Sequence, residues 1–276
     1  MIKMMQWVTT TILICGTTVF TSCSKNDNPA STGENLAEKI IGKWLIEDVE
    51  GQSLMTNEKC MLTFLSDSKA YMSASIYPDE SESAWDQGKD YDVSINGKKV
   101  TLINTLDEHR KIILELIITS INNKEMQTNW SIIRMIDDDV DGAGMGTMGF
   151  TKVTRDYSEA ILGTWEGHET SSKGSEYDKK ESRWTFKNDG TYVYYSLNDA
   201  DEWVPSEDDF AEYFVDGNLL CSRWKNSGEG QQEKREWWEI KSIKNGVMIW
   251  TALRQKEDRT TYTVTFEMTK VDDNSK

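Results

Sequence analysis

The chain has 276 residues, with 31 Lys and Arg against 47 Asp and Glu, which gives a formal net charge of −16 at pH 7. An acidic chain repels phosphate backbones and gains nothing from anionic headgroups, so this composition argues against nucleic-acid binding and against membrane attachment through a basic face. The length suits two domains of ordinary size, each able to bury a core of its own.

Residues 1–22 have the features of an export signal rather than of a folded element. Lys3 supplies a positive n-region, and residues 8–20 form an apolar stretch that is too short and too rich in threonine to span a membrane. The stretch ends at Phe20-Thr21-Ser22-Cys23, which resembles the lipobox of bacterial lipoproteins. That resemblance implies cleavage before Cys23 and lipidation of its thiol, with palmitate among the expected acyl chains. The alternative is an ordinary cleaved signal followed by an incidental cysteine.

Residues 23–35 are expected to form a polar tether, because they contain too few apolar groups to pack. A lipid on Cys23 would anchor the tether to the outer membrane, on its periplasmic face or at the cell surface.

Residues 36–154 and 155–276 are predicted to be two copies of one unit. Ile40-Ile41-Gly42-Lys43-Trp44 matches Ile161-Leu162-Gly163-Thr164-Trp165, with an offset of 121 between the glycines. An offset of 122 relates later landmarks of the two copies, namely Phe64 and Phe186, Asp67 and Asp189, Ser120 and Ser242, and Met126 and Met248. A period this regular indicates a tandem repeat.

Alternation of apolar and polar residues predicts that both copies are built from β-strands. Each copy opens with a short helical turn, at residues 36–40 and 158–162, and a glycine then releases the chain into a strand. The clearest strand is residues 262–268, in which apolar and polar residues alternate strictly. Asn-Gly and Asp-Gly pairs predict tight hairpin turns because both residue types tolerate positive φ; they stand at Asn96-Gly97, Asp216-Gly217 and Asn245-Gly246.

The apolar runs predict roughly seven to eight short strands per copy, joined by hairpin turns. Consecutive antiparallel strands hide their edges by closing into a small barrel, whose interior is filled by side chains or holds one small ligand. The predicted fold is therefore all-β, with two tandem antiparallel up-and-down barrels.

The pattern resembles the tandem lipocalin-like domains of bacterial outer-membrane lipoproteins. The resemblance is carried by the Gly-x-Trp strand after a short helix and, in the second copy, by Trp184-Thr185-Phe186, Asp189-Gly190-Thr191-Tyr192, residues 238–243 and Met268-Thr269-Lys270-Val271. It covers the second copy and, loosely, the first, and it implies a barrel that binds a ligand or partner without catalysis.

Two features of the lipocalin pattern are missing, a Thr-Asp-Tyr motif between the later strands and an arginine after the last strand. We expect Lys152 and Lys270 to stack over Trp44 and Trp165 instead. The first copy has also drifted, since residues 137–149 are expected to replace part of a strand pair. The second copy is therefore expected to keep the pocket, with the first as its scaffold.

Tryptophan is concentrated in the second copy and supplies the candidate ligand-binding residues. Trp237 and Trp238 cannot both face one core, because side chains alternate along a strand, so one of them is expected to face solvent or a ligand. Trp203 lies in an acidic loop, residues 198–209, where packing does not explain it. The full candidate set is Trp165, Trp184, Trp203, Trp237, Trp238 and Trp250, of which Trp165, Trp184 and Trp250 equally suit a barrel core.

Asp137-x-Asp139-x-Asp141-Gly142 resembles the start of a calcium loop, in which alternating carboxylates converge on the ion. The twelfth position, which should be glutamate, is Met148, so a solvated acidic loop is the favoured interpretation and no metal is expected. The glycines of residues 142–146 lack the βαβ context of a dinucleotide site, and no cofactor is expected.

Catalysis is not expected from the residues present. His109 and His168 are the two histidines and occupy unrelated positions in the copies, and Glu207-Asp208-Asp209 has the composition of an exposed loop. Cys15 leaves with the signal and Cys23 takes lipid. For the remaining pair, Cys60 and Cys221, two buried thiols are favoured over a disulfide that joins the copies.

We therefore expect an envelope lipoprotein whose second barrel binds a small apolar or glycan-type ligand through aromatic residues. The alternative is a protein–protein interaction module of an envelope transport or glycan-uptake assembly, which would dock through exposed aromatic residues and loops.

Overall fold

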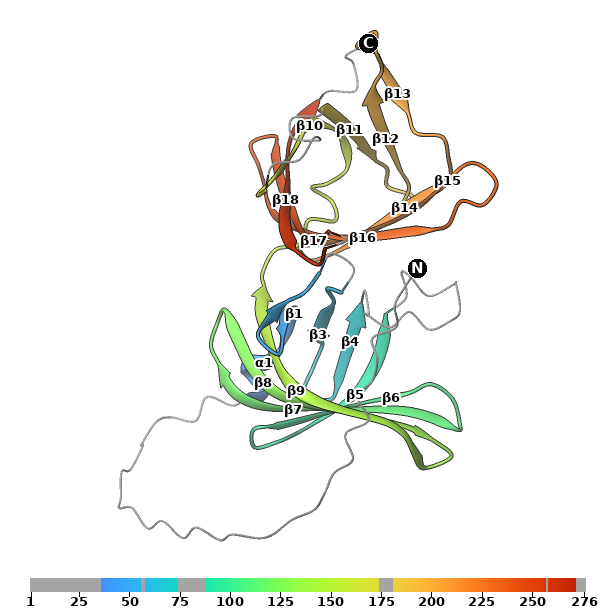
Figure 1. Cartoon of the computed structure of the whole chain (residues 1–276). Helices are drawn as coiled ribbons and strands as arrows, with labels where there is room; N and C mark the ends of the chain where they lie inside the picture. Colours follow the sequence, from blue (N-terminus) through green and yellow to red (C-terminus); the bar gives the residue numbers. More distant parts are fainter. Residues whose placement is uncertain (1–35, 56–57, 74–87, 174–180, 257, 272–276) are drawn as a thin grey trace. The chain divides into compact units, whose positions relative to one another are not determined.

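The computed structural model describes residues 36–55, 58–73, 88–173, 181–256 and 258–271 (Figure 1). The expected signal, Cys23 and the tether lie outside the described residues. Residues 34–276 belong to one compact unit. No helix in the described ranges is long and apolar enough to cross a membrane.

The first sheet forms a closed barrel. After the helix α1 (Leu36–Ile40) the strands follow one another as a meander, and β1 pairs with both β3 and β9, which joins the ends of the sheet. The strands are β1 (Gly42–Val49), β2 (Gln52–Ser53), β3 (Met61–Phe64), β4 (Lys69–Ser73), β5 (Lys89–Asn96), β6 (Lys99–Thr105), β7 (Arg110–Ile121), β8 (Glu125–Ile136) and β9 (Asp139–Val153).

The second sheet is also an antiparallel meander. It curls round, but no continuous ladder joins its two ends. Its first and last strands, β10 and β18, pair along their length, and the sheet order is β13-β12-β11-β10-β18-β17-β16-β15-β14. Its strands are β10 (Gly163–Ser171), β11 (Glu181–Phe186), β12 (Tyr192–Leu197), β13 (Trp203–Pro205), β14 (Asp208–Asp216), β15 (Leu219–Asn226), β16 (Lys234–Lys244), β17 (Val247–Gln255) and β18 (Thr261–Val271).

The ends of the second sheet meet at a seam between β12 and β14. The seam is marked by an isolated bridge between Thr191 and Glu212 and by a hydrogen bond from Tyr213 N–H to the Gly190 carbonyl. The ladder of the first sheet is therefore the one that closes, although the sequence pattern of the second copy is the clearer of the two.

The hairpin turns lie where the sequence predicts them. Asn96-Gly97 joins β5 to β6, residues 216–218 join β14 to β15, and Asn245-Gly246 joins β16 to β17. Asn245 and Gly246 both have positive φ, 52° and 73°, as a tight hairpin turn with right-handed strand twist requires.

Two segments differ from expectation. Residues 137–149 were expected to replace part of a strand pair, but β8 and β9 pair from Glu125↔Thr151 to Ile136↔Asp139. Glycine at alternate positions of β9 leaves room for large residues of β8, since a Cβ at Gly142 would lie 2.8 Å from Arg134 Nη2 and one at Gly146 would lie 3.2 Å from Trp130 Nε1. The predicted acidic loop at residues 198–209 contains β13 and the start of β14.

Each sheet encloses its own apolar core, and a third cluster of buried residues contains side chains from both sheets. Leu45 and Met61 of the first sheet pack there with Leu219, Cys221 and Trp237 of the second. This packing corrects the expectation that Trp237 or Trp238 faces solvent or a ligand. Trp238 is in the interior of its sheet and Trp237 is buried in the third cluster, so both faces of β16 are covered.

Candidate functional site

The interior of the second sheet contains the aromatic side chains that the sequence predicts as ligand-binding residues. Trp165, Trp238 and Trp250 are almost fully buried there. Their rings contact one another and neighbouring rings. The ring centroids of Trp250 and Phe266 lie 5.6 Å apart, and those of Trp238 and Phe266 lie 5.2 Å apart. These tryptophans therefore fill the core, and a ligand cannot reach them without displacing packed rings.

Trp184 of β11 lies at the border of this packed region. It is half-buried, and its ring contacts those of Tyr194 and Trp250 at centroid distances of 5.0 and 5.6 Å. Its indole Nε1 is buried and has no acceptor among the described residues, and the same holds for the hydroxyl of Ser182, two positions earlier on the same face of β11. Buried donors without acceptors are uncommon, and these two groups can still form hydrogen bonds inside the sheet.

A charged group lies beside these donors and was not predicted from the sequence. Arg254 of β17 donates from Nε and Nη2 to the two carboxylate oxygens of Glu236, at 2.8 and 3.1 Å, and from Nη1 to Glu169 at 3.3 Å. The guanidinium carbon lies 5.0 Å from the ring centroid of Trp238. The three charged side chains are 26, 14 and 17% exposed for Arg254, Glu236 and Glu169.

Strand register places all three side chains on the inner face. Glu169 is directly opposite Phe266, Arg254 is opposite Tyr262, and Glu236 precedes Trp238 by two positions on β16. Residues that face each other across a ladder lie on the same side of the sheet, and so do residues two apart on one strand. The sequence of β17 could have shown that Arg254 faces inward, because Met248, Trp250, Ala252 and Arg254 are spaced two apart and therefore lie on one face of the strand.

The charges affect one another as their geometry predicts. Burial acts to lower the pKa of Arg254, but hydrogen bonds and charge from Glu236, together with the charge of Glu169, raise it. Burial, followed by the charge of Glu169, raises the pKa of Tyr194. The group therefore presents a guanidinium held by two glutamate side chains to the interior.

The remaining predicted tryptophans have structural explanations. Trp203 of β13 is half-buried, with the guanidinium carbon of Arg183 4.7 Å from its ring centroid. Trp237 belongs to the third cluster described above. Neither side chain contributes to the interior of the second sheet.

The two expected cation–π contacts are present. Lys152 Nζ lies 4.9 Å from the ring centroid of Trp44, and Lys270 Nζ lies 5.2 Å from that of Trp165. In each copy the tryptophan Nε1 donates to a carbonyl four residues earlier, Ile40 at 2.7 Å and Ile161 at 2.6 Å. The same lysine–tryptophan contact therefore covers the corresponding end of both sheets.

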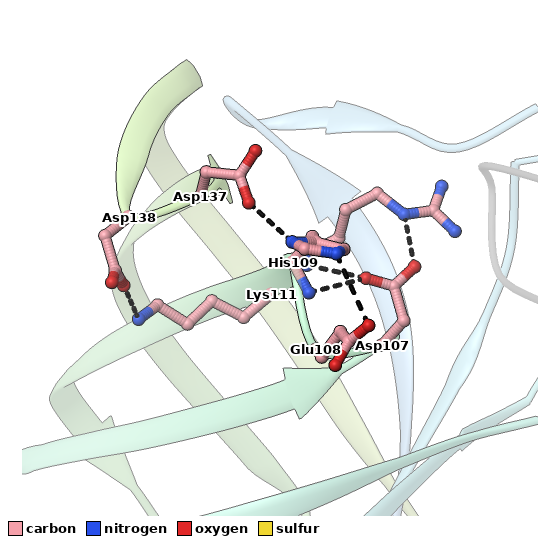
Figure 2. A network of polar contacts seen from close by, with 7 residues as sticks. Asp107, Glu108, His109, Lys111, Asp137 and Asp138 are labelled. Atoms are coloured by element: carbon pink, nitrogen blue, oxygen red, sulfur yellow. Dashed lines mark hydrogen bonds and ion pairs between the residues drawn. The ribbon is translucent and has the colours of Figure 1, made fainter.

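Three of the four carboxylates at residues 137–141 have basic partners, and Figure 2 draws the pairs of Asp137 and Asp138. Asp137 Oδ1 lies 2.6 Å from His109 Nδ1, and Asp138 accepts from Lys111 at 2.7 Å. Asp141 lies 3.7 Å from Arg134. Within the described ranges, no cluster of three or more His, Cys, Asp or Glu side chains is positioned to hold a metal ion.

The segment Glu207-Asp208-Asp209 is not the simple exposed loop that its composition suggests. Asp208 begins β14 and accepts from the Asn226 amide at 2.8 Å, while Asp209 pairs with Lys225 at 2.9 Å. Burial raises the pKa of Asp208, against the opposing effect of the Asn226 hydrogen bond.

Cys60 and Cys221 are both buried free thiols, as favoured from the sequence. Burial raises the pKa of Cys60 to about 12. The two thiols therefore behave as small apolar side chains of the core.

No protein-family model matches the chain, and curated proteins give no match either. Among solved structures, the chain is similar to transferrin binding protein B from Haemophilus parasuis, a vaccine antigen crystallised as a double mutant, with 8% identity and a TM-score of 0.27 over 84% of this chain and 45% of that chain. It therefore spans less than half the length of that protein.

A second similar structure comes from Bacteroides fragilis, where its assignment as an outer membrane protein is itself provisional. It has 10% identity and a TM-score of 0.23, over 86% of this chain and 100% of that chain. TM-scores this low establish no shared function, and the fold rests on the strand pairing described above.

Proposed function

We propose that this chain is a non-catalytic envelope lipoprotein whose second sheet binds a polar, ring-shaped ligand of the glycan type. The observation that carries the proposal is the inward-facing group of Arg254, Glu236 and Glu169, on the same face of the sheet as the half-buried Trp184. A buried ion-pair network contributes little net stability compared with apolar packing, so its presence inside a small sheet favours a role in recognition.

The chemistry of the group matches a sugar better than a purely apolar ligand. Guanidinium N–H groups and carboxylate oxygens donate to and accept from hydroxyls, and an aromatic ring supports the apolar face of a sugar ring. A purely apolar ligand would remove water from this ion-pair network without offering it any hydrogen-bonding group in return.

The test is a panel of mono- and oligosaccharides added to the full chain, with tryptophan emission and thermal shift as readouts. Arg254→Met should abolish the response. The matched control is Arg223→Met, because Arg223 makes an equivalent ion pair with Glu212, at 2.8 and 2.6 Å, from the opposite face of the same sheet. A panel without any response, or equal responses from both variants, would refute the glycan site.

Membership of the lipoprotein class rests on the residues before the first sheet. Phe20-Thr21-Ser22-Cys23 supports lipidation of Cys23 and attachment to the outer membrane. Labelling of cells with palmitate tests this directly. Cys23→Ala should lose the label and release the protein from the membrane fraction, and a labelled variant would contradict the proposal.

The division into domains at residues 36–154 and 155–276 belongs to the same proposal. It is supported by the two separate sheets, although residues 34–276 form one compact unit and a shared cluster of buried residues joins them. Limited proteolysis followed by unfolding of each half measures how independent the halves are.

A second candidate function is the docking of another envelope protein. It is favoured by apolar side chains that the first sheet leaves in solvent, notably Met145 at 76% exposure and Val140 at 63%.

A further inference from the structure

β9 continues past the end of β1 and leaves part of its length with one open edge (Figure 1). The β1 ladder on β9 ends at Val49↔Met148, whereas the β8 ladder continues to Ile136↔Asp139. Along residues 139–146 the side of β9 away from β8 therefore has no strand partner in the described ranges. An open edge of this kind is a template for an additional strand.

The direction of the backbone groups at this edge follows from Thr147. Its carbonyl accepts from Glu50 N–H at 3.0 Å, and its own N–H donates to the Glu50 carboxylate at 2.7 Å, so both groups point toward the β1 side. Backbone groups point to alternate edges along a strand, which directs the N–H and C=O of Met145 and Ala143 to the open edge.

The side chains next to the edge define what the added strand should carry. On the outer face, Ile103, Ile113, Ile133 and Ala143 are directly opposed across β6, β7, β8 and β9, and the row ends at Ala143. An apolar residue opposite Ala143 would continue this row, because cross-strand neighbours on one face pack together.

Carboxylates outnumber basic groups around the edge, where Arg134 is the basic side chain and lies 3.7 Å from Asp141. Glu50 lies at one end of the open stretch, where a Cβ on Gly146 would collide with its carboxylate, and Asp139 and Asp141 lie at the other end. A second copy of this chain would bring these carboxylates against their own equivalents, on top of a net charge of −16. Like charges across a ladder destabilise pairing, so the edge favours a basic segment over self-association.

We propose that residues 139–146 of β9 bind an extended segment of a partner protein as an additional strand, one with alternating apolar and basic residues. Main-chain hydrogen bonds to Met145 and Ala143 supply affinity, and contacts of basic side chains with Glu50, Asp139 and Asp141 supply selectivity. The surface gives the docking function a defined site, and it lies on a different sheet from the ligand group around Arg254.

The probe is a fluorescent eight-residue peptide of alternating Lys and Val, measured by anisotropy with the full chain. A matched peptide of alternating Glu and Val tests the charge argument. We expect the lysine peptide to bind and the glutamate peptide to bind at least about tenfold more weakly, since each lost charge-assisted contact removes a substantial part of the binding energy.

N-methylation of the peptide tests the main-chain contacts without altering the protein. Methyl groups on one alternating set of amides should weaken binding about tenfold or more, and methyl groups on the other set should be tolerated, because the two sets point to opposite edges of the added strand. Equal effects of the two sets would refute strand addition.

Substitutions in the chain give the complementary test. Met145→Pro removes an N–H that faces the open edge and should abolish peptide binding, whereas Met145→Ala retains that N–H and should bind within a few-fold of the original chain. Arg254→Met should leave peptide binding unchanged, which separates this site from the glycan site. Absence of binding by the lysine peptide, or a dimer of the chain that Met145→Pro dissociates, would overturn the proposal.

Discussion

Lys270 Nζ lies 5.2 Å from the ring centroid of Trp165, and the two residues are directly opposed across the β10–β18 ladder. The same relationship joins Lys152 and Trp44 in the first sheet. In both copies the lysine stem covers a glycine with positive φ, since a Cβ on Gly163 would lie 3.1 Å from Lys270 Cε.

Lys270→Ala should destabilise the second sheet by about 1 kcal/mol, because it removes the cation and the methylene cover of a buried indole. Lys270→Arg should retain most of the stability. Lys244→Ala is the control, since Lys244 is an exposed residue on β16. Denaturant unfolding measures the difference, and equal midpoints for Lys270→Ala and Lys244→Ala would contradict the cation–π contact.

Cys60 and Cys221 should resist thiol reagents in the folded chain, because both are buried and burial raises the pKa of Cys60 to about 12. At pH 8 a small alkylating reagent should modify neither residue until denaturant is added. Mass spectrometry of the corresponding peptides measures this. Rapid labelling of Cys60 in the folded protein would show that the first core opens.

Asp156 contributes to stability in a pH-dependent way. Burial acts to raise its pKa, but hydrogen bonds from Ser158 and Lys43 outweigh burial and lower the pKa to about 2. A lowered folded-state pKa means that the stabilisation is present above the unfolded pKa of about 3.9 and is lost as pH falls through about 2.

Asp156→Asn should therefore destabilise the chain at pH 7 by about 1 kcal/mol, after allowance for the 48% exposure of the side chain. The difference from the original chain should shrink as pH falls below 4. Urea unfolding at several pH values gives the comparison, and a difference that stays constant with pH would show that Asp156 does not act through its charge.

Trp250→Ala should destabilise the chain by about 3–5 kcal/mol, because it leaves a cavity among packed rings. Trp203→Ala should have a much smaller effect, since Trp203 is half-buried on the three-residue strand β13. Loss of near-ultraviolet circular dichroism on heating provides the measurement. Similar effects from both substitutions would mean that the inner cluster is less tightly packed than its ring contacts indicate.

Calcium should produce no heat of binding and no thermal shift, because Asp137, Asp138 and Asp141 pair with His109, Lys111 and Arg134 and leave Asp139 as a single carboxylate. Titration calorimetry on the chelator-treated chain checks this. A calcium-dependent rise in melting temperature that Asp139→Asn removes would restore the metal hypothesis.

Much of the fold could be predicted from residues that specify one local structure without help from tertiary contacts. Asn245-Gly246 specified a turn because few residues tolerate two successive positive φ angles, and residues 262–268 specified a strand because alternation serves one buried face. The repeat offsets extended these local predictions from the second copy to the first.

The candidate site was predicted less well because its meaning depends on tertiary partners. One of Trp237 and Trp238 was expected to face solvent or a ligand, but Trp237 is buried with Leu45 and Met61, about which local alternation carries no information. Arg254 and Glu236 look like ordinary surface residues in the sequence, and only their phase relative to Trp250 and Trp238 places them inside.

The seam between β12 and β14 has a mechanical consequence. A barrel in which every pair of neighbouring strands is hydrogen-bonded has a fixed circumference, since widening it would break all the hydrogen bonds between two strands. At the seam, the second sheet is held by the Thr191–Glu212 bridge and the Tyr213–Gly190 hydrogen bond. Its circumference can therefore change while the other strand pairs stay intact. The seam is therefore the line along which the second sheet can widen without breaking a strand ladder.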